Sequence, residues 1–266
     1  MATTDPWPDD EALESAYADW YRPATGRFVG PGDRILRRAR GVLARRVSRI
    51  APAGPVLDVG AGDGALLDAL RTQGRDAIGL ERHSTRSDVH TGDLDDLDGH
   101  FAAIVFWHSL EHLPEPGRAL ERAAELLLPD GLLVIALPNA DSLQARLFGD
   151  EWLALDLPRH LVHVPAGALL ARLGALGLRV KRVSHVRGGQ VVFGWLHGLV
   201  GLLPGSPDLY DAIRRPAARR DAAPAPARAA AIGAGAVLLP AAVVLASVEA
   251  VLRRGGSVYV ESRKLA

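Results

Sequence analysis

The sequence predicts an α/β fold in which a mostly parallel, doubly wound, seven-stranded sheet is covered by helices on both faces. Short apolar runs typical of buried strands alternate with longer amphipathic stretches typical of helices over most of the chain. One such run, Val56–Val59, leads directly into three alternating glycines. The length of 266 residues allows one large core with additions rather than two equal domains.

Residues 1–50 are predicted to form a helical extension. Residues 1–10 are acidic and contain prolines, so we expect a frayed terminus. A short helix is expected over residues 11–21, where three aromatic side chains would close onto the domain: Tyr17, Trp20 and Tyr21. Asp33 is a suitable N-cap for a second, arginine-rich amphipathic helix that runs to Ile50.

Residues 51–187 are predicted to form the core, which the final segment 257–266 completes with one more strand over Ser257–Lys264. The other strands are expected near 55–59, 77–81, 88–91, 102–107, 131–137 and 178–186. Helices are expected near 64–73, near 116–128, and from Pro165 to Gly174 or Gly177.

Residues 188–256 form an apolar insertion before the last strand. Two stretches of 20 residues, 188–207 and 229–248, carry no formal charge if His197 is neutral, and a bilayer span takes ~20 apolar residues. The arginine-rich connection 208–228 opposes transfer across a membrane. Two interpretations therefore stay open, a buried helical pair and a cap that lies in the plane of a membrane, and a transmembrane hairpin comes third.

The composition excludes several classes of function. The net charge is zero, which gives no electrostatic reason to expect nucleic-acid binding. The chain has no cysteine, so disulfides, thiolate catalysis and cysteine-ligated zinc are excluded. Residues 1–10 show no secretory signal pattern, and we expect a cytoplasmic protein.

The glycine run predicts a binding site for a nucleotide-like cofactor. Gly60, Gly62 and Gly64 allow a ligand to approach the backbone at the start of a helix, whose N-terminus is partly positive. The pattern also fits a dinucleotide loop, with Glu81 as the ribose-binding acid. However, acids end three successive strand regions, at Asp58, Glu81 and Asp93. These acids suit an ammonium group, a ribose diol and an adenine amino group, and would crowd a pyrophosphate.

With these motifs the chain resembles the class I S-adenosylmethionine-dependent methyltransferases, and among them the bacterial small-molecule group. The matching segments are VLDVGAGDG at 56–64, Gly79–Glu81, Gly92–Leu94, Phe106–Leu113, Pro129–Gly131 and Asp156–Leu161. The resemblance implies a Rossmann-like fold whose last strand runs antiparallel beside the sixth. It also implies that S-adenosyl-L-methionine is bound by Asp58, Gly60, Gly62, Gly64, Glu81, Arg82, Asp93, Leu94 and His108.

The expected reaction is methyl transfer to a small or lipid-like acceptor, with a hydroxyl oxygen as the favoured nucleophile. Two alternatives from other classes stay open. One is an NAD(P)-dependent oxidoreductase, and the other is a non-catalytic, membrane-associated module that keeps the cofactor fold.

Asp156–His160 is the segment that best suits acceptor chemistry, because it lies in a long connection after the fifth strand. His160 is the predicted base, with Asp156 beside it, and His108 is the second candidate. The alternative is a structural polar knot of Asp156, Arg159 and His160. We expect Pro158 to start a helical turn that puts His160 and His163 on one face.

No metal site is predicted. His160 and His163 have no acid at a suitable spacing to complete one, and methyl transfer needs none. Glu111 and His112 are expected to stabilise the turn before Pro114 and to start the next helix rather than to act in catalysis.

Overall fold

A central sheet of seven strands organises the computed structural model, which describes residues 1–17, 27–82, 84, 86–186, 189–219 and 223–265. The strand order is β4-β3-β2-β5-β6-β9-β8. The strands are β2 (Val56–Val59), β3 (Ala77–Glu81), β4 (Val89–Thr91), β5 (Phe101–Trp107), β6 (Leu127–Pro138), β8 (Leu178–Ser184) and β9 (Ser257–Lys264).

The sheet is parallel except for its last strand. β2 pairs in parallel with β3 and with β5, and β5 pairs in parallel with β6. β9 is inserted between β6 and β8 and runs antiparallel to both. This arrangement confirms the predicted doubly wound sheet with an antiparallel final strand beside the sixth.

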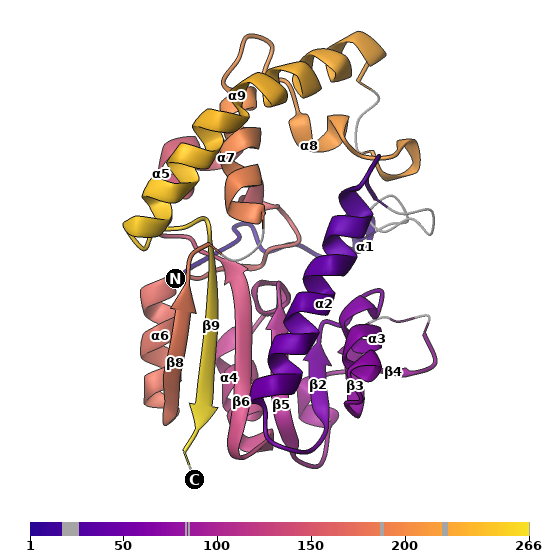
Figure 1. Cartoon of the computed structure of the whole chain (residues 1–266), viewed down its shortest axis with the longest axis vertical. Coiled ribbons are helices and arrows are strands. Elements are labelled where there is room, and N and C mark those ends of the chain that lie inside the picture. The colour runs from indigo at the N-terminus through magenta and orange to yellow at the C-terminus, as the bar shows by residue number, and fades with distance from the viewer. Residues whose placement is uncertain (18–26, 83, 85, 187–188, 220–222, 266) are drawn as a thin grey trace.

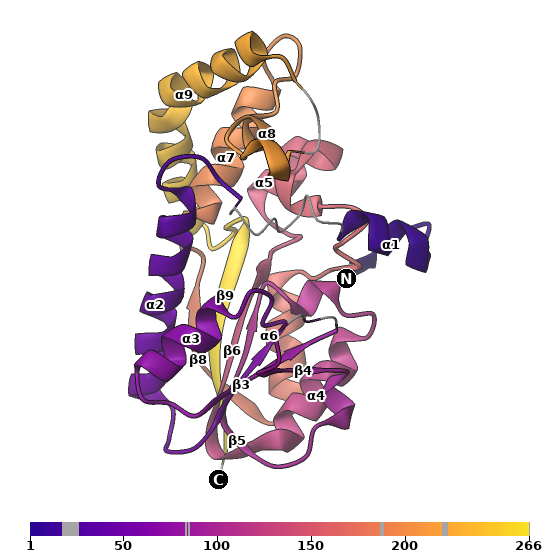
Figure 2. The ribbon, with the colours of Figure 1, turned by 90° about the vertical axis from the view of Figure 1, so that its right-hand side faces the viewer.

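Helices cover both faces of the sheet (Figures 1 and 2). One face packs against α2 (Gly32–Ile50) and α3 (Ala65–Thr72), and the other against α4 (Pro116–Leu126) and α6 (Ala166–Ala175). Every residue of β5 from Phe101 to Phe106 is buried, as expected for a strand covered on both sides.

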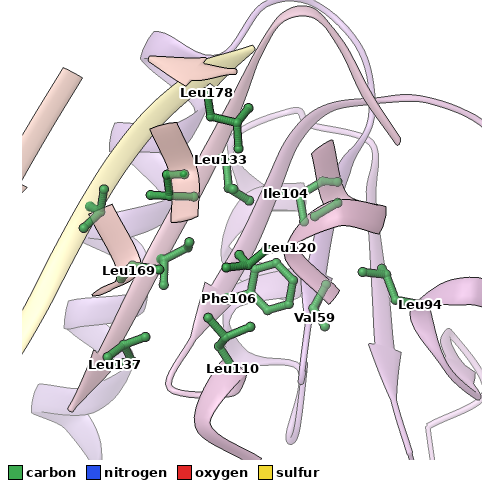
Figure 3. Packing of buried hydrophobic residues seen from close by; sticks show 14 of the residues in the cluster. Val59, Leu94, Ile104, Phe106, Leu110, Leu120, Leu133, Leu137, Leu169 and Leu178 are labelled. Atoms are coloured by element: carbon green, nitrogen blue, oxygen red, sulfur yellow. The ribbon is translucent and has the colours of Figure 1, made fainter. Parts of the chain in front are cut away.

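Figure 3 shows how leucines from the covering helices fill the core. Leu120 of α4 and Leu169 of α6 lie against the side chains of β5 and β6, with Phe106 at the centre. Burial of one such side chain stabilises the fold by roughly 1.5–3 kcal/mol. This layer therefore fixes the carboxyl ends of β2, β3 and β5, where the predicted site residues lie.

The expectation of a frayed N-terminus is wrong. β1 (Ala2–Thr3) pairs antiparallel with β7 (Val162–His163), and the N–H of Thr4 donates to the carbonyl of Leu161 at 3.0 Å. The backbone of the segment near His160 would otherwise lack these partners, and the first residues supply them.

The first helix, α1 (Asp10–Ala16), is shorter than expected. Asp9 caps it, with its carboxylate accepting from the N–H of Ala12 at 2.8 Å. Tyr17 ends the helix, and its ring lies edge-on to that of His112. Trp20 and Tyr21, which complete the expected aromatic group, lie outside the described residues.

The apolar insertion forms a helical cap beyond the carboxyl ends of the parallel strands (Figure 1). It contains α7 (Gln190–Gly201), α8 (Leu209–Ala212) and the long helix α9 (Ala225–Val251), and it packs on α5 (Leu143–Phe148). The predicted helical pair corresponds to α7 and α9, which lie side by side.

The alternative of a fully buried pair is wrong for α9. Among the described residues, α9 is the one helix long and apolar enough to cross a membrane, and most of its surface is exposed. α7 has 12 residues and is about 18 Å long, which is too short for a bilayer span. A hairpin of two transmembrane helices is therefore excluded for this pair.

Candidate active site

The glycine loop after β2 has a conformation that requires glycine. The φ angles of Gly60, Gly62 and Gly64 are 78°, 57° and 73°, a region that other residues rarely adopt. A Cβ atom on Gly60 would lie 2.3 Å from the Cβ of Ser109. Ser109 in turn donates its hydroxyl to the carbonyl of Val59 at 2.5 Å. The loop after β5 is thus attached directly to the start of the glycine loop.

Two acids stand at the base of this loop. Asp58 is buried at the end of β2, and burial raises the pKa of its carboxyl group to about 7, although the nearby Arg40 acts in the opposite direction. Glu81 ends β3 and accepts backbone hydrogen bonds from Gly62 at 2.9 Å and from Arg82 at 3.2 Å. Glu81 therefore fixes the glycine loop as well as the tip of its own strand.

The remaining predicted cofactor residues lie at the same edge of the sheet. Asp93 is exposed just beyond β4, and its N–H donates to the carboxylate of Asp96 at 2.9 Å. Leu94 is buried in the core, and Figure 3 shows it at the rim of the leucine layer. Arg82 is exposed. The structure thus gathers the three acids at one edge, while the contact of each with a cofactor stays a prediction.

A second group of polar residues surrounds Glu111, and we call His108, Glu111, His112, Asp156 and His160 the Glu111 cluster. Nδ1 of His108 lies 3.4 Å from Oε1 of Glu111, and Nε2 of His160 lies 3.9 Å from the same oxygen. Neither carboxylate oxygen of Glu111 has a hydrogen-bond partner within normal distance among the described residues.

The electrostatics of the cluster follow from its histidines. Burial by itself would raise the pKa of Glu111, but His108, His112 and His160 outweigh it and lower this pKa to about 2. The cluster therefore holds a buried carboxylate that is charged at neutral pH and that can stabilise a protonated imidazole.

Backbone carbonyls orient two of the imidazoles. Nδ1 of His160 lies 2.8 Å from the carbonyl of Ala154, and Nδ1 of His112 lies 2.8 Å from that of Arg159. A carbonyl only accepts, so we assign the proton to Nδ1 in both rings, which leaves Nε2 as the acceptor in the neutral form. Burial lowers the pKa of His112 to about 4 and so favours this neutral form.

The segment 156–160 forms the predicted polar knot. Arg159 pairs with Asp156, with Nε 3.2 Å from Oδ2, and Nε2 of His160 lies 3.6 Å from the same oxygen. Burial raises the pKa of Asp156, but His160 and Arg159 outweigh it, and the net shift is downward. These contacts fix the loop, whether or not His160 also performs chemistry.

The expectation that His160 and His163 share a helical face is wrong. Residues 157–160 form a turn without helix, and His163 lies in β7. Its Nε2 atom lies 3.4 Å from the hydroxyl of Thr4.

Sequence reasoning missed Glu111 and His112 as members of the site. Both lie in a short 3₁₀ helix, Leu110–His112, directly after β5. The available signal was the run of ionisable residues His108, Glu111 and His112 immediately after a fully buried strand.

The cluster also contains groups that are able to hold a metal ion. Glu111, His112 and His160 each offer one ligand atom, and these atoms lie within 4.8 Å of one another. Two imidazoles and a carboxylate suit zinc and related ions. The prediction of no metal rested on the pair His160 and His163, which has no acid at a suitable spacing along the chain. The fold instead brings Glu111, from a distant segment, to within 3.9 Å of Nε2 of His160.

Known proteins resemble this chain in sequence and in fold. Residues 35–183, more than half of the chain, match the family model described as methyltransferase domain. The ubiquinone biosynthesis O-methyltransferase of Xanthomonas axonopodis pv. citri (strain 306) is 29% identical over an alignment of 162 residues, which covers 52% of this chain and 68% of that protein. The protein of the same name from Azorhizobium caulinodans is 24% identical over an alignment of 196 residues, which covers 65% of this chain and 73% of that protein.

Two solved structures share the fold. The [4+2]-cyclase SpnF superposes with a TM-score of 0.51 at 21% identity, over 96% of this chain and 92% of that one. A SAM-dependent methyltransferase from Thermotoga maritima, described as a possible histamine N-methyltransferase, gives 0.50 at 14% identity, over 87% and 90%. At these identities the likeness establishes the fold alone.

Proposed function

Because this chain belongs to the methyltransferase domain family and is an S-adenosylmethionine-dependent methyltransferase, we propose that it methylates a hydroxyl oxygen of a small, lipid-like acceptor. The dinucleotide alternative is set aside by this family membership. S-adenosylmethionine supplies an electrophilic methyl group on a positively charged sulfur. The protein has to bind this cofactor, align the acceptor hydroxyl and remove its proton.

The glycine loop and its acids fit the cofactor. A Cβ on Gly60 or Gly64 would lie within 2.5 Å of a neighbouring side-chain atom, so the loop is shaped by its lack of side chains. We assign Asp58 to the ammonium group, Glu81 to the ribose hydroxyls, and Asp93 to the adenine amino group. Gly62, Arg82, Leu94 and His108 line the same edge of the sheet.

We assign the base to the Glu111 cluster, and within it to His108. The observation that carries this assignment is an accessible imidazole backed by a buried carboxylate: the His108 side chain is 19% exposed, and the Glu111 side chain 2%. A protonated His108 would be stabilised by Glu111, as general-base catalysis requires. His160, the first candidate from the sequence, is 10% exposed and is held in the polar knot. It is the second candidate, with Asp156 orienting it.

A lipid-like acceptor is supported by the apolar cap. α7 and α9 lie beyond the carboxyl ends of the strands (Figure 1), where they face the side of the sheet that carries the site. The two curated relatives described above are O-methyltransferases of ubiquinone biosynthesis by name. We therefore place the protein in the cytoplasm, at or near a membrane that holds its acceptor.

Incubation with methyl-labelled S-adenosylmethionine and either a lipid extract or a soluble-metabolite extract tests this function. We expect label in a solvent-extractable product whose mass fragments place the new methyl group on oxygen. The His108→Ala variant should bind the cofactor and give little product. Label found only on a nitrogen or in water-soluble products would contradict the proposal. Cofactor binding without turnover in either extract would support the non-catalytic module instead.

A further inference from the structure

The long helix α9 has an inverted distribution of side-chain sizes. Its buried apolar positions are small residues, Ala231, Gly235, Ala242 and Ala246. Its exposed positions carry branched residues, and Val237, Val244 and Val251 are 79%, 61% and 83% exposed. A helix packed on a water-soluble domain is expected to bury its large apolar residues and to expose polar ones. Helices in contact with lipid show the pattern seen here, with small residues on the packed side.

The exposed side of α9 is also without charge. Between Arg228 and Arg253 the only ionisable residue is Glu249, and it is completely buried. The exposed Ser247 donates its hydroxyl to the carbonyl of Val243 at 2.8 Å, within the helix itself. An apolar surface of this length is costly in water, whereas burying it in hydrocarbon is favourable.

Both halves of α9 are attached to the protein, so the helix lies along the body rather than across a bilayer. In the first half, Gly235 packs so closely on Leu209 of α8 that a Cβ there would lie 3.2 Å from the leucine. In the second half, the carboxylate of Glu249 accepts from the indole of Trp195 on α7 at 2.9 Å. A helix held along its length in this way can present only one side to lipid.

Basic residues surround this apolar surface. Arg228 precedes it, and Arg253 and Arg254 follow it. Figure 2 shows α2 along the same side of the molecule as the carboxyl-terminal half of α9. The exposed positions of α2 include five arginines: Arg34, Arg37, Arg38, Arg45 and Arg49. Each arginine close to an anionic lipid surface contributes attraction, so the charge matches a negatively charged bilayer.

We propose that α9 docks in the interfacial layer of an anionic phospholipid bilayer, parallel to the membrane plane. The contact surface consists of Val237, Val244, Val248 and Val251, which share the side of the helix opposite the buried residues, with the flanking arginines at the lipid headgroups. The inference goes beyond the proposed function, because this contact needs neither the cofactor nor the acceptor.

Vesicle flotation tests the docking. The full chain is mixed with vesicles of phosphatidylcholine alone, or of phosphatidylcholine and phosphatidylglycerol in equal parts. We expect flotation with the mixed vesicles, weaker flotation with the neutral ones, and release at high salt or in carbonate. A triple variant with Val237→Glu, Val244→Glu and Val251→Glu should bind about a thousandfold more weakly, since burial of each of the three valines contributes about tenfold or more.

Leu265→Glu is the control, because Leu265 is 58% exposed and directly precedes the C-terminal residue, and the C-terminus lies at the end of the molecule opposite α9 (Figure 1). This variant should float like the unmodified protein. All variants should keep the same S-adenosylmethionine affinity and melting temperature, which separates a docking defect from misfolding.

Three results would overturn the proposal. The first is equal flotation of the triple variant, and the second is resistance to carbonate, which would indicate a spanning helix. The third is a stable dimer in solution that the triple substitution dissolves, which would mean that a second copy covers α9. None of these results bears on methyl transfer, so the proposed function would be judged separately.

Discussion

Nε2 of His160 lies 3.9 Å from Oε1 of Glu111, and Nδ1 of His108 lies 3.4 Å from the same oxygen. One buried carboxylate is therefore shared by two imidazoles that come from connections on either side of β6. Because the pKa of Glu111 is lowered to about 2, this carboxylate is charged at neutral pH. The arrangement can stabilise a proton that either histidine takes from an acceptor.

The first prediction concerns the base. His108→Ala should lower kcat by about a hundredfold to ten-thousandfold, the usual contribution of a general base. The Kd for S-adenosylmethionine should change much less, because the cofactor keeps its assigned contacts with the glycine loop and the three acids. Glu111→Gln should also lower kcat, because a neutral amide stabilises a protonated imidazole less than the carboxylate does. Turnover with methyl-labelled cofactor and calorimetric titration give the two quantities.

His163→Ala is the control for these variants, since His163 lies in β7 and outside the cluster. A parallel His160→Ala variant distinguishes the two candidates. If His160→Ala lowers both the melting temperature and the activity, the role of His160 is to hold the polar knot. If it alone abolishes turnover while His108→Ala does not, the assignment of His108 is wrong.

The second prediction concerns Glu81. Glu81→Ala should weaken S-adenosylmethionine binding, because two charge-assisted hydrogen bonds to the ribose would be lost, at roughly 1.5–3 kcal/mol each. The variant also loses the hydrogen bond from the N–H of Gly62 to Glu81, which adds to the expected loss of affinity. Asp98→Ala is the control for removal of an acidic side chain, because Asp98 is exposed, and its affinity should stay unchanged. Unchanged affinity in Glu81→Ala, or a preference for NAD, would count against the assigned cofactor contact.

The third prediction is a pH dependence of cofactor binding that comes from Asp58. Its pKa is raised to about 7, so the free protein binds a proton there as pH falls below 7. If Asp58 receives the ammonium group, the bound state requires the charged carboxylate. Affinity should then fall by up to about tenfold for each pH unit below about 7, and binding near neutral pH should release a proton.

Calorimetry in buffers with different ionisation enthalpies measures that proton release. Asp58→Asn should abolish it and flatten the pH dependence. The raised pKa also means that Asp58 contributes stability below its unfolded pKa, and that this contribution is lost as pH rises through about 7. The asparagine variant of the free protein should therefore melt higher than the unmodified protein above about pH 8. A pH-independent affinity in the unmodified protein would rule out this role.

Those features of the fold that depend on local pattern were predictable. The strand of Val56–Val59, the glycine turn and the acid at the end of β3 are each encoded within a few residues, and the structure places them as expected. The N-terminal strand was not predictable, because Ala2 and Thr3 form it only through the backbone of Val162 and His163.

The acceptor side of the site depends on contacts between distant segments. Glu111 precedes β6 in the sequence and His160 follows it, and the two meet only in the folded structure, so spacing along the chain gives no sign of their proximity. The orientation of α9 could not be predicted from the sequence for a different reason. A helix that is apolar on every side has no polar stripe to mark its outer face, and only the structure shows that Ala242 and Ala246 face inward.

The fourth prediction concerns metal ions. Base catalysis by His108 needs no metal, so we expect full methyl transfer in the presence of a chelator. Added zinc should inhibit, because Glu111, His112 and His160 can bind it and would then hold the carboxylate that supports the base. Elemental analysis of the purified protein and activity before and after chelation provide the measurements. Loss of activity on chelation, restored by a divalent ion, would show that the cluster is a working metal centre.

The last prediction concerns the attachment of α9. The buried Glu249 carboxylate accepts three hydrogen bonds, from the backbone and side chain of Gln144 at 3.0 and 2.9 Å and from the indole of Trp195 at 2.9 Å. In Glu249→Gln one acceptor oxygen becomes an NH₂ group that faces a donor. A buried donor without a partner costs about 1–3 kcal/mol, which corresponds to roughly 2–4 °C in Tm per kcal/mol for a domain of about this size.

Ser247→Ala on the same helix is the control, because Ser247 is exposed and bonds only within α9 among the described residues. Its melting temperature should stay within about 1–2 °C of the unmodified protein, as for most surface substitutions. Hydrogen exchange should speed up in α9 and α7 of Glu249→Gln, while β2 and β5 stay protected, since the lost contacts lie in the cap. Equal melting temperatures for the two variants would show that Glu249 does not hold α9 to the protein.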